Sequence, residues 1–131
     1  MRMRKKKNLD ERLSQCSQLF VQAKPGKWRG DRAADTPLYL EIGCGKGRFC
    51  VESAKEMPDC EFVAVEREPN VIVMAAEKAL NAGLTNLRFI SVDAIKLGEV
   101  FAPSEVDRIY LNFSDPWPNK KHWKRDRKSV V

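Results

Sequence analysis

The 131-residue sequence lacks several features that would place it in other protein classes. No apolar run reaches the roughly 20 residues that a membrane-spanning helix needs. The N-terminus is basic, but no apolar segment follows it, so it does not have the pattern of a secretory signal. We therefore expect a cytoplasmic protein with no membrane partner.

Cysteine and histidine are too few, and too irregularly spaced, to indicate a metal site. The four cysteines include no C-x-x-C pair, and the one histidine, His122, lies far from them along the chain. Structural zinc sites combine such ligands at short, characteristic spacings. We expect no metal and reduced thiols, as in intracellular proteins. With 43% hydrophobic residues, the chain still suffices for one domain with a core.

The stretch that organises the chain runs over residues 38–49 and reads LYLEIGCGKGRF. Its apolar first half predicts a buried strand, and a helical pattern follows. Between them lie Gly43, Gly45 and Gly47 at two-residue spacing. Strand, glycine-rich turn and helix form the opening unit of a nucleotide-binding α/β sheet. Taken alone, the turn is weak evidence, because it also serves as a tight strand-to-helix connection.

Strand and helix patterns alternate after the turn and predict a parallel sheet with flanking helices. We expect further strands at 61–66, 87–92 and 106–112, and a helix between Pro69 and Gly83. In the N-terminal region, the sequence predicts at most a short helix at about residues 10–20. Each of four predicted strands finishes in a carboxylate: Glu41, Glu66, Asp93 and Asp115. Ligands of such sheets bind beyond the carboxyl ends of the strands, where these side chains would gather.

Taken one by one, these carboxylates have structural explanations: Asp93 suits a helix N-cap, Glu66 a surface loop, and Asp115 a turn before proline. Their joint position on one edge favours a ligand site. Glu66, about twenty residues past the turn, is placed to accept hydrogen bonds from ribose hydroxyls.

The remaining carboxylates are also placed to contact groups of a bound ligand. Asp93 is placed for the amine of an adenine, and Asp115 for a reacting group. Glu41 would repel a pyrophosphate but suits a cation. This combination favours S-adenosylmethionine over a dinucleotide, and an NAD-binding fold is a distant alternative.

The net charge of +6 is concentrated at the two ends of the chain. Residues 1–7 hold five basic side chains and no acid, and residues 119–131 hold six basic side chains and one acid. This distribution indicates a polyanionic partner, although solvated tails explain the N-terminal run equally well. Near the C-terminal run, a Pro-Trp-Pro turn and Trp123 interleave aromatic rings with cations, as phosphate gripping and base stacking require.

These motifs resemble bacterial tRNA (guanine-N7-)-methyltransferases. The resemblance is carried by EIGCGKG at 41–47, by Glu66 and Asp93, and by EVDRIYLNFSDPWP at 105–118. It implies a Rossmann-like class I methyltransferase fold and transfer of a methyl group from S-adenosylmethionine to guanine N7 in the tRNA variable loop. The implied cofactor residues are Glu41, Gly43, Gly45, Gly47, Glu66, Asp93 and Asp115. Asp115 is also the implied catalytic acid, and the implied RNA-contacting residues are Asn119, Lys120, Lys121, His122, Trp123, Lys124, Arg125 and Asp126.

The sequence departs from this family in two places. The family has a substrate-contacting lysine directly after Pro-Trp-Pro, where this chain has Asn119, and Lys120 is the nearest replacement. The family also continues with further helices and strands, so we expect a shortened product whose fourth strand has an open apolar edge. Such an edge is open to aggregation or self-association, and we expect a monomer or a weak homo-oligomer.

We predict three segments: a basic extension and loop at 1–36, a cofactor-binding α/β domain at 37–118, and a basic RNA-contacting tail at 119–131. Two alternative functions remain open. One is a non-catalytic cofactor- or RNA-binding fragment. The other is a methyltransferase acting on an amino nitrogen of a nucleobase.

Overall fold

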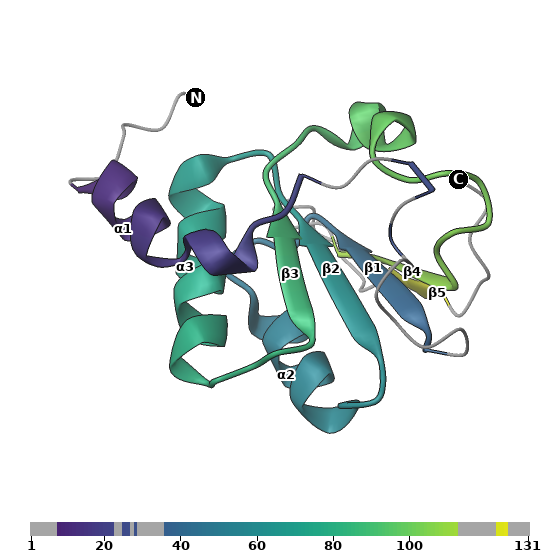
Figure 1. Cartoon of the computed structure of the whole chain (residues 1–131), viewed down its shortest axis with the longest axis horizontal. Helices are drawn as coiled ribbons and strands as arrows, with labels where there is room; N and C mark the ends of the chain where they lie inside the picture. Colours follow the sequence, from purple (N-terminus) through teal and green to yellow (C-terminus); the bar gives the residue numbers. More distant parts are fainter. Residues whose placement is uncertain (1–7, 23–24, 27, 29–35, 113–122, 126–131) are drawn as a thin grey trace.

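The computed structural model describes residues 8–22, 25–26, 28, 36–112 and 123–125 (Figure 1). In this part of the chain, one sheet has the strand order β3-β2-β1-β4-β5. Its first four strands in sequence run parallel, and β5 is antiparallel to β4. The elements, with η for a 3₁₀ helix, are α1 (Leu9–Gln15), η1 (Ser17–Leu19), β1 (Leu38–Ile42), α2 (Arg48–Glu56), β2 (Glu61–Val65), α3 (Pro69–Asn81), β3 (Leu87–Ile90), η2 (Ala94–Glu99), β4 (Arg108–Leu111) and β5 (Trp123–Arg125).

Both faces of the sheet are buried, which explains why its central strands are apolar throughout. On one face, Phe62 and Ala64 pack with residues of α2 and α3. On the other, Val63 and Val65 pack with Trp28 and Phe101. Figure 1 shows α1, α2 and α3 on one side of the sheet, and the loop that carries η2 on the other. The predicted parallel α/β fold is confirmed.

The ends of α3 follow the local signals in the sequence. Glu68 caps its first turn by accepting from the backbone N–H of Asn70 (3.2 Å), and Pro69 occupies the first helical position, where a missing N–H costs nothing. Gly83, with φ at +68°, follows the C-cap residue Ala82 and ends the helix.

Four elements are shorter than the sequence pattern predicts, among them the second strand, which ends at Val65, and the fourth, which spans Arg108–Leu111. The third strand ends at Ile90, because its last paired neighbour, Val65, is also the last residue of β2. The N-terminal helix ends at Gln15, because Cys16 leaves helical geometry with φ at −104° and ψ at 10°, and η1 follows.

The expectation of an open edge beside the fourth strand is wrong for the described residues. β5 pairs with β4 in antiparallel register, with Ile109 opposite Arg125 and Leu111 opposite Trp123. β5 therefore pairs with the edge of β4 that the sequence predicted to be open.

The region before residue 37 contributes to the core through a buried carboxylate, Glu105. Its oxygens accept from the backbone N–H groups of Gly26 (3.1 Å), Trp28 (2.9 Å) and Ala102 (2.9 Å). The indole N–H of Trp28 donates to the Val100 carbonyl (2.8 Å), and its ring stacks on Phe101 at 4.7 Å between centroids. These contacts fasten the loop to the sheet.

Among the described residues, no helix has the length and apolar character needed to cross a membrane. The same residues contain no group of three or more His, Cys, Asp or Glu side chains arranged to hold a metal ion.

Candidate functional site

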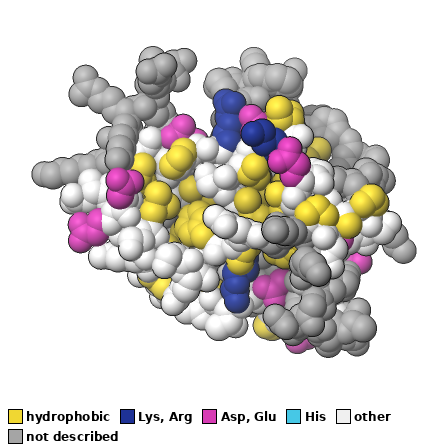
Figure 2. Space-filling view, turned by 45° about the horizontal axis from the view of Figure 1, so that its top comes forward, with side chains coloured by type: hydrophobic (Ala, Val, Ile, Leu, Met, Phe, Trp, Pro, Cys, Tyr) yellow, Lys and Arg dark blue, Asp and Glu magenta, His cyan; other side chains and the backbone are white. Residues whose placement is uncertain are grey.

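A cavity of about 230 Å³ opens at the carboxyl ends of the parallel strands. Its lining comes from the last residues of β1 and β2, the residues just beyond them, and the segment that leads from β3 into η2: Ile42, Gly43, Val65, Glu66, Arg67, Val92, Asp93 and Ala94. Figure 2 brings this edge forward and shows hydrophobic side chains gathered at its centre, with acidic and basic groups around them. The structure thus brings together Gly43, Glu66 and Asp93, which the sequence predicts as cofactor residues.

Glu66 is held between the glycine turn and the start of α3. Its Oε1 accepts from the backbone N–H of Gly45 (3.1 Å), and its Oε2 accepts from the backbone N–H of Glu68 (3.2 Å). A carboxylate oxygen has two acceptor positions, so each oxygen can accept a further hydrogen bond. A pair of neighbouring hydroxyl groups on a ligand matches this fixed pair of oxygens.

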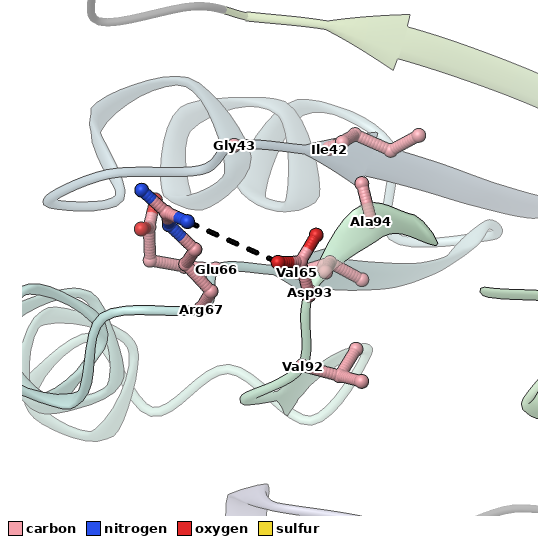
Figure 3. A pocket seen from close by; sticks show the side chains of 8 residues that line it. All are labelled: Ile42, Gly43, Val65, Glu66, Arg67, Val92, Asp93 and Ala94. Carbon is pink, nitrogen blue, oxygen red and sulfur yellow. Dashed lines mark ion pairs between the residues drawn. The ribbon is translucent and has the colours of Figure 1, made fainter. Parts of the chain in front are cut away.

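Asp93 lies across the cavity from Glu66 and performs the structural role considered for it. Its Oδ1 caps η2 by accepting from the backbone N–H of Ile95 (3.2 Å). Its Oδ2 lies 3.9 Å from Nη1 of Arg67, and Figure 3 shows this guanidinium reaching toward Asp93. Capping fixes the carboxylate at the cavity, so the structural role and a ligand role are compatible.

Gly43 and Gly47 in the turn lie so close to neighbouring atoms that a side chain at either position would clash. A Cβ on Gly43 would lie 2.8 Å from the Asn112 carbonyl oxygen, and one on Gly47 would lie 2.6 Å from Cβ of Ala75 in α3. Both residues also have positive φ, at +80° and +89°, which favours glycine. The turn therefore joins the ends of β1 and β4 and brings α2 against α3.

Glu41 is fully buried beneath this turn and does not line the cavity. Its Oε2 accepts from the side-chain amide of Asn112 (2.9 Å), whereas its Oε1 has no hydrogen-bond partner among the described residues. Burial raises the pKa of Glu41 to about 7, against the lowering effects of Asn112 and of the nearby Cys50 thiol. The Cys50 thiol itself donates to the Gly47 carbonyl at 3.5 Å, so it does not satisfy Oε1.

The electrostatics of this edge select against phosphate. Glu66 and Asp93 line the cavity, Arg67 offsets one charge, and Glu41 lies close enough that the Glu66 charge raises its pKa. Such a site suits a ligand with hydroxyl, amine or cationic groups. Glu41 lies buried behind this edge rather than in the cavity, and its Oε1, which has no partner among the described residues, is an acceptor that a donor such as an ammonium group would satisfy.

Several predicted site residues lie outside the described residues: Asp115, Asn119, Lys120, Lys121, His122 and Asp126. For Trp123, Lys124 and Arg125, the structure gives the backbone of β5. Their assignments as catalytic or RNA-contacting residues stay predictions.

Two residues of this edge have no role in the sequence-based prediction. Arg67 directly follows Glu66, and Asn112 directly follows β4. Position at a strand end is the signal that could have identified both. The partner of Asn112 could not be read from the sequence, because Glu41 is 71 residues away.

A parallel sheet ordered β3-β2-β1-β4, with a glycine turn after β1 and carboxylates at the strand ends, defines a Rossmann-like methyltransferase fold. The family model described as "Putative methyltransferase" matches residues 35–127. The chain belongs to this family.

Named relatives extend this comparison over nearly the whole chain. It is 43% identical over 128 residues to the tRNA (guanine-N(7)-)-methyltransferase of Geobacillus kaustophilus, covering 95% of this chain and 59% of the relative. It is 40% identical over 129 residues to the enzyme of the same name from Streptococcus suis, covering 95% of this chain and 60% of the relative. The chain thus spans about three fifths of the length of these relatives.

Solved structures share the fold. TrmN from Thermus thermophilus is 28% identical with a TM-score of 0.52, covering 79% of this chain and 26% of that one. Precorrin-6y C5,15-methyltransferase from Geobacter metallireducens is 20% identical with a TM-score of 0.53, covering 82% of this chain and 49% of that one. The second likeness concerns the fold alone.

Proposed function

We propose that this chain binds S-adenosylmethionine at the carboxyl edge of its sheet and transfers the methyl group to N7 of a guanine in the variable loop of tRNA. The observation that carries the proposal is the cavity that Glu66 and Asp93 share beside the glycine turn. The names of relatives that match 95% of the chain support N7 of a tRNA guanine as the acceptor.

The residues at this edge fit the groups of the cofactor. The two fixed oxygens of Glu66 suit the ribose hydroxyls, and Asp93 suits the exocyclic amine of adenine. The apolar side chains of Ile42, Val65 and Val92 suit the faces of the base. The Oε1 of Glu41, which has no hydrogen-bond partner in the described part of the chain, suits the ammonium group of the methionine moiety.

The reaction requires little acid–base catalysis by the protein. Guanine N7 carries a lone pair and no proton, so it can attack the sulfonium methyl carbon directly. The carbon–sulfur bond breaks, its electron pair stays on sulfur, and the positive charge passes to the guanine ring. The protein must mainly align donor and acceptor. In this proposal, Asp115 holds the guanine through its N1 and N2 donors and stabilises the developing charge.

Binding is tested first, by calorimetric titration of the full chain with S-adenosylmethionine and, separately, with NAD. We expect saturable binding of S-adenosylmethionine only. Absence of binding by a chain that is folded by circular dichroism would overturn the cofactor assignment.

Transfer is tested next, by incubating tRNA with the chain and methyl-labelled S-adenosylmethionine and digesting the product to nucleosides. We expect label in 7-methylguanosine. Label on an amino nitrogen would instead support the alternative nucleobase methyltransferase, and binding without transfer would support the non-catalytic fragment.

The role of Asp115 needs its own variant. Asp115→Ala is expected to lower turnover of labelled tRNA. Full turnover with unchanged affinity for S-adenosylmethionine would remove Asp115 from the mechanism.

A further inference from the structure

Asn112 directly follows β4 and is joined to the end of β1 by two hydrogen bonds. Its backbone N–H donates to the Ile42 carbonyl (3.2 Å), and its side-chain amide donates to Oε2 of Glu41 (2.9 Å). Its own carbonyl oxygen lies against Gly43, so closely that a Cβ there would be 2.8 Å away. Backbone contacts on both sides therefore fix this amide relative to the Glu41 carboxyl group.

The contact makes the two oxygens of Glu41 unequal. Oε2 has its donor, whereas Oε1 is buried and has no partner among the described residues. Leaving a buried carboxylate oxygen unsatisfied is costly, so a site that maintains one gains from a ligand that donates to it. An ammonium group is such a ligand, and it binds the ionised carboxylate far better than the protonated acid.

We propose that Asn112 is a positioning residue for the cofactor: its amide orients Glu41 and favours its ionised form, with Oε1 left for the amino group of the methionine moiety. This inference rests on the proposed function, because it requires an adenosyl cofactor with an amino group at this edge of the sheet.

The groups around Glu41 explain why the Asn112 amide has a large effect on the ionisation of this carboxyl group. Burial raises the pKa of Glu41 most, and the charge of Glu66, beyond β2, raises it further. The amide of Asn112 and the thiol of Cys50, in α2, lower it. Cys44, in the turn, faces the same carboxyl group as a thiol whose own pKa is raised well above its usual value, chiefly by a hydrogen bond with Cys50. None of these groups is a cation, so the neutral amide is a main support of the charged form.

The test is calorimetric titration of the full chain with S-adenosylhomocysteine from pH 6 to pH 9, for the wild type, Asn112→Ala and Asn112→Asp. This ligand keeps the amino group and lacks the reactive methyl. The ionisation of the ligand affects the Kd of the variant and of the wild type equally. The ratio of the two Kd values at each pH therefore does not depend on it.

Loss of the amide should raise the pKa of Glu41 by about one unit. Asn112→Ala should then bind about fivefold more weakly at pH 7, with a ratio approaching one at pH 9. Asn112→Asp keeps the side-chain shape but places a second carboxyl group against the first. Its ratio should exceed that of Asn112→Ala at pH 7 and stay above one at pH 9.

Asn86→Ala is the matched control. The amide of Asn86 donates to the carbonyls of Ala54, Met57 and Cys60 (3.1, 3.1 and 3.0 Å), and the residue lies just before β3, at the opposite edge of the sheet. We expect this variant to lose thermal stability while its Kd ratio stays the same at every pH.

A pH-independent ratio for Asn112→Ala would show a purely structural role and overturn the inference while leaving the proposed function intact. A wild type that binds no S-adenosylhomocysteine would overturn both. A second readout needs no ligand: a carbon-13 titration of the Glu41 carboxyl group in the free chain. An unchanged titration in Asn112→Ala would overturn the inference on its own.

Discussion

Glu41 combines complete burial, a hydrogen bond from the Asn112 amide and a pKa of about 7, against an ordinary value of 4.5. Because the folded state raises this pKa, it holds the proton more tightly than the unfolded chain does. The stabilisation from that proton is fully present below about pH 4.5 and is lost as the pH rises through about 7.

Glu41→Gln should remove this dependence, because a glutamine of the same shape keeps an acceptor for Asn112 and cannot ionise. Relative to this variant, the wild type should lose about 3 kcal/mol of unfolding free energy between pH 4 and pH 9. Urea denaturation at both pH values measures this, and the difference between the two proteins cancels the titration of all other groups. Parallel pH profiles would contradict the raised pKa.

Glu66 needs both of its oxygens as acceptors, because each already receives a backbone N–H. In Glu66→Gln, the amide nitrogen would face an N–H donor and one ribose acceptor would be lost. We expect binding of S-adenosylhomocysteine to weaken at least about tenfold, the effect of losing a hydrogen bond to a charged group.

Glu68→Gln is the control for this change at the same junction. Glu68 uses one oxygen, Oε1, to accept from both the backbone N–H and the side-chain amide of Asn70 (3.2 and 2.8 Å). A glutamine preserves this pattern, and Glu68 does not line the cavity. Similar losses of affinity in the two variants would argue against a specific ligand role for Glu66.

At the scale of elements, the start of α2 meets the middle of α3 at Gly47 and Ala75. In Gly47→Ala, the alanine would have to adopt the positive φ of this position, which is unfavourable for a residue with a Cβ. That Cβ would also lie 2.6 Å from Cβ of Ala75. Gly83→Ala is matched to it, because Gly83 also has positive φ, at +68°, with nothing within 4 Å of the added carbon.

Gly83→Ala should therefore cost about 1 kcal/mol of stability, and Gly47→Ala a further 1–3 kcal/mol or so from overpacking. Chemical denaturation of both variants measures the difference. Equal losses would mean that α3 shifts freely to admit the methyl group, and that the third glycine of the turn serves the backbone conformation alone.

The local parts of this architecture could be predicted from the sequence. The strand at Leu38–Ile42, the glycine turn and the helix from Pro69 each depend on residues within a few positions of one another. The gathering of Glu66 and Asp93 also followed, because parallel strands bring their carboxyl ends to one edge.

Long-range contacts could not be predicted in the same way. Glu105 binds the backbone of Trp28, 77 residues away, and Arg12 pairs with Glu77 through two hydrogen bonds of 2.8 and 2.6 Å, 65 residues away. No pattern in either segment specifies its partner. The pairing of β5 with β4 escaped prediction for a related reason: three residues, Trp123–Arg125, show no strand periodicity, and their partner alone makes them a strand.

At the scale of the whole molecule, the net positive charge lies at the two ends of the sequence, while the middle is net acidic. If the C-terminal basic segment contacts tRNA, it should do so mainly through phosphates, because lysine acts there as a point charge. Affinity for tRNA should therefore fall steeply with salt concentration.

Substituting two lysines of this segment, in Lys120→Ala/Lys121→Ala, should lower the slope of log K against log salt by about two, close to one for each phosphate that a lysine no longer neutralises. Filter binding of labelled tRNA at several salt concentrations measures the slope. The control, Lys55→Ala/Lys78→Ala, makes the same change in net charge on the exposed surfaces of α2 and α3. Equal changes of slope in both double variants would assign the effect to overall charge. A change confined to the first would mean that the residues directly before β5 in the sequence contact the RNA, while β5 itself pairs with β4.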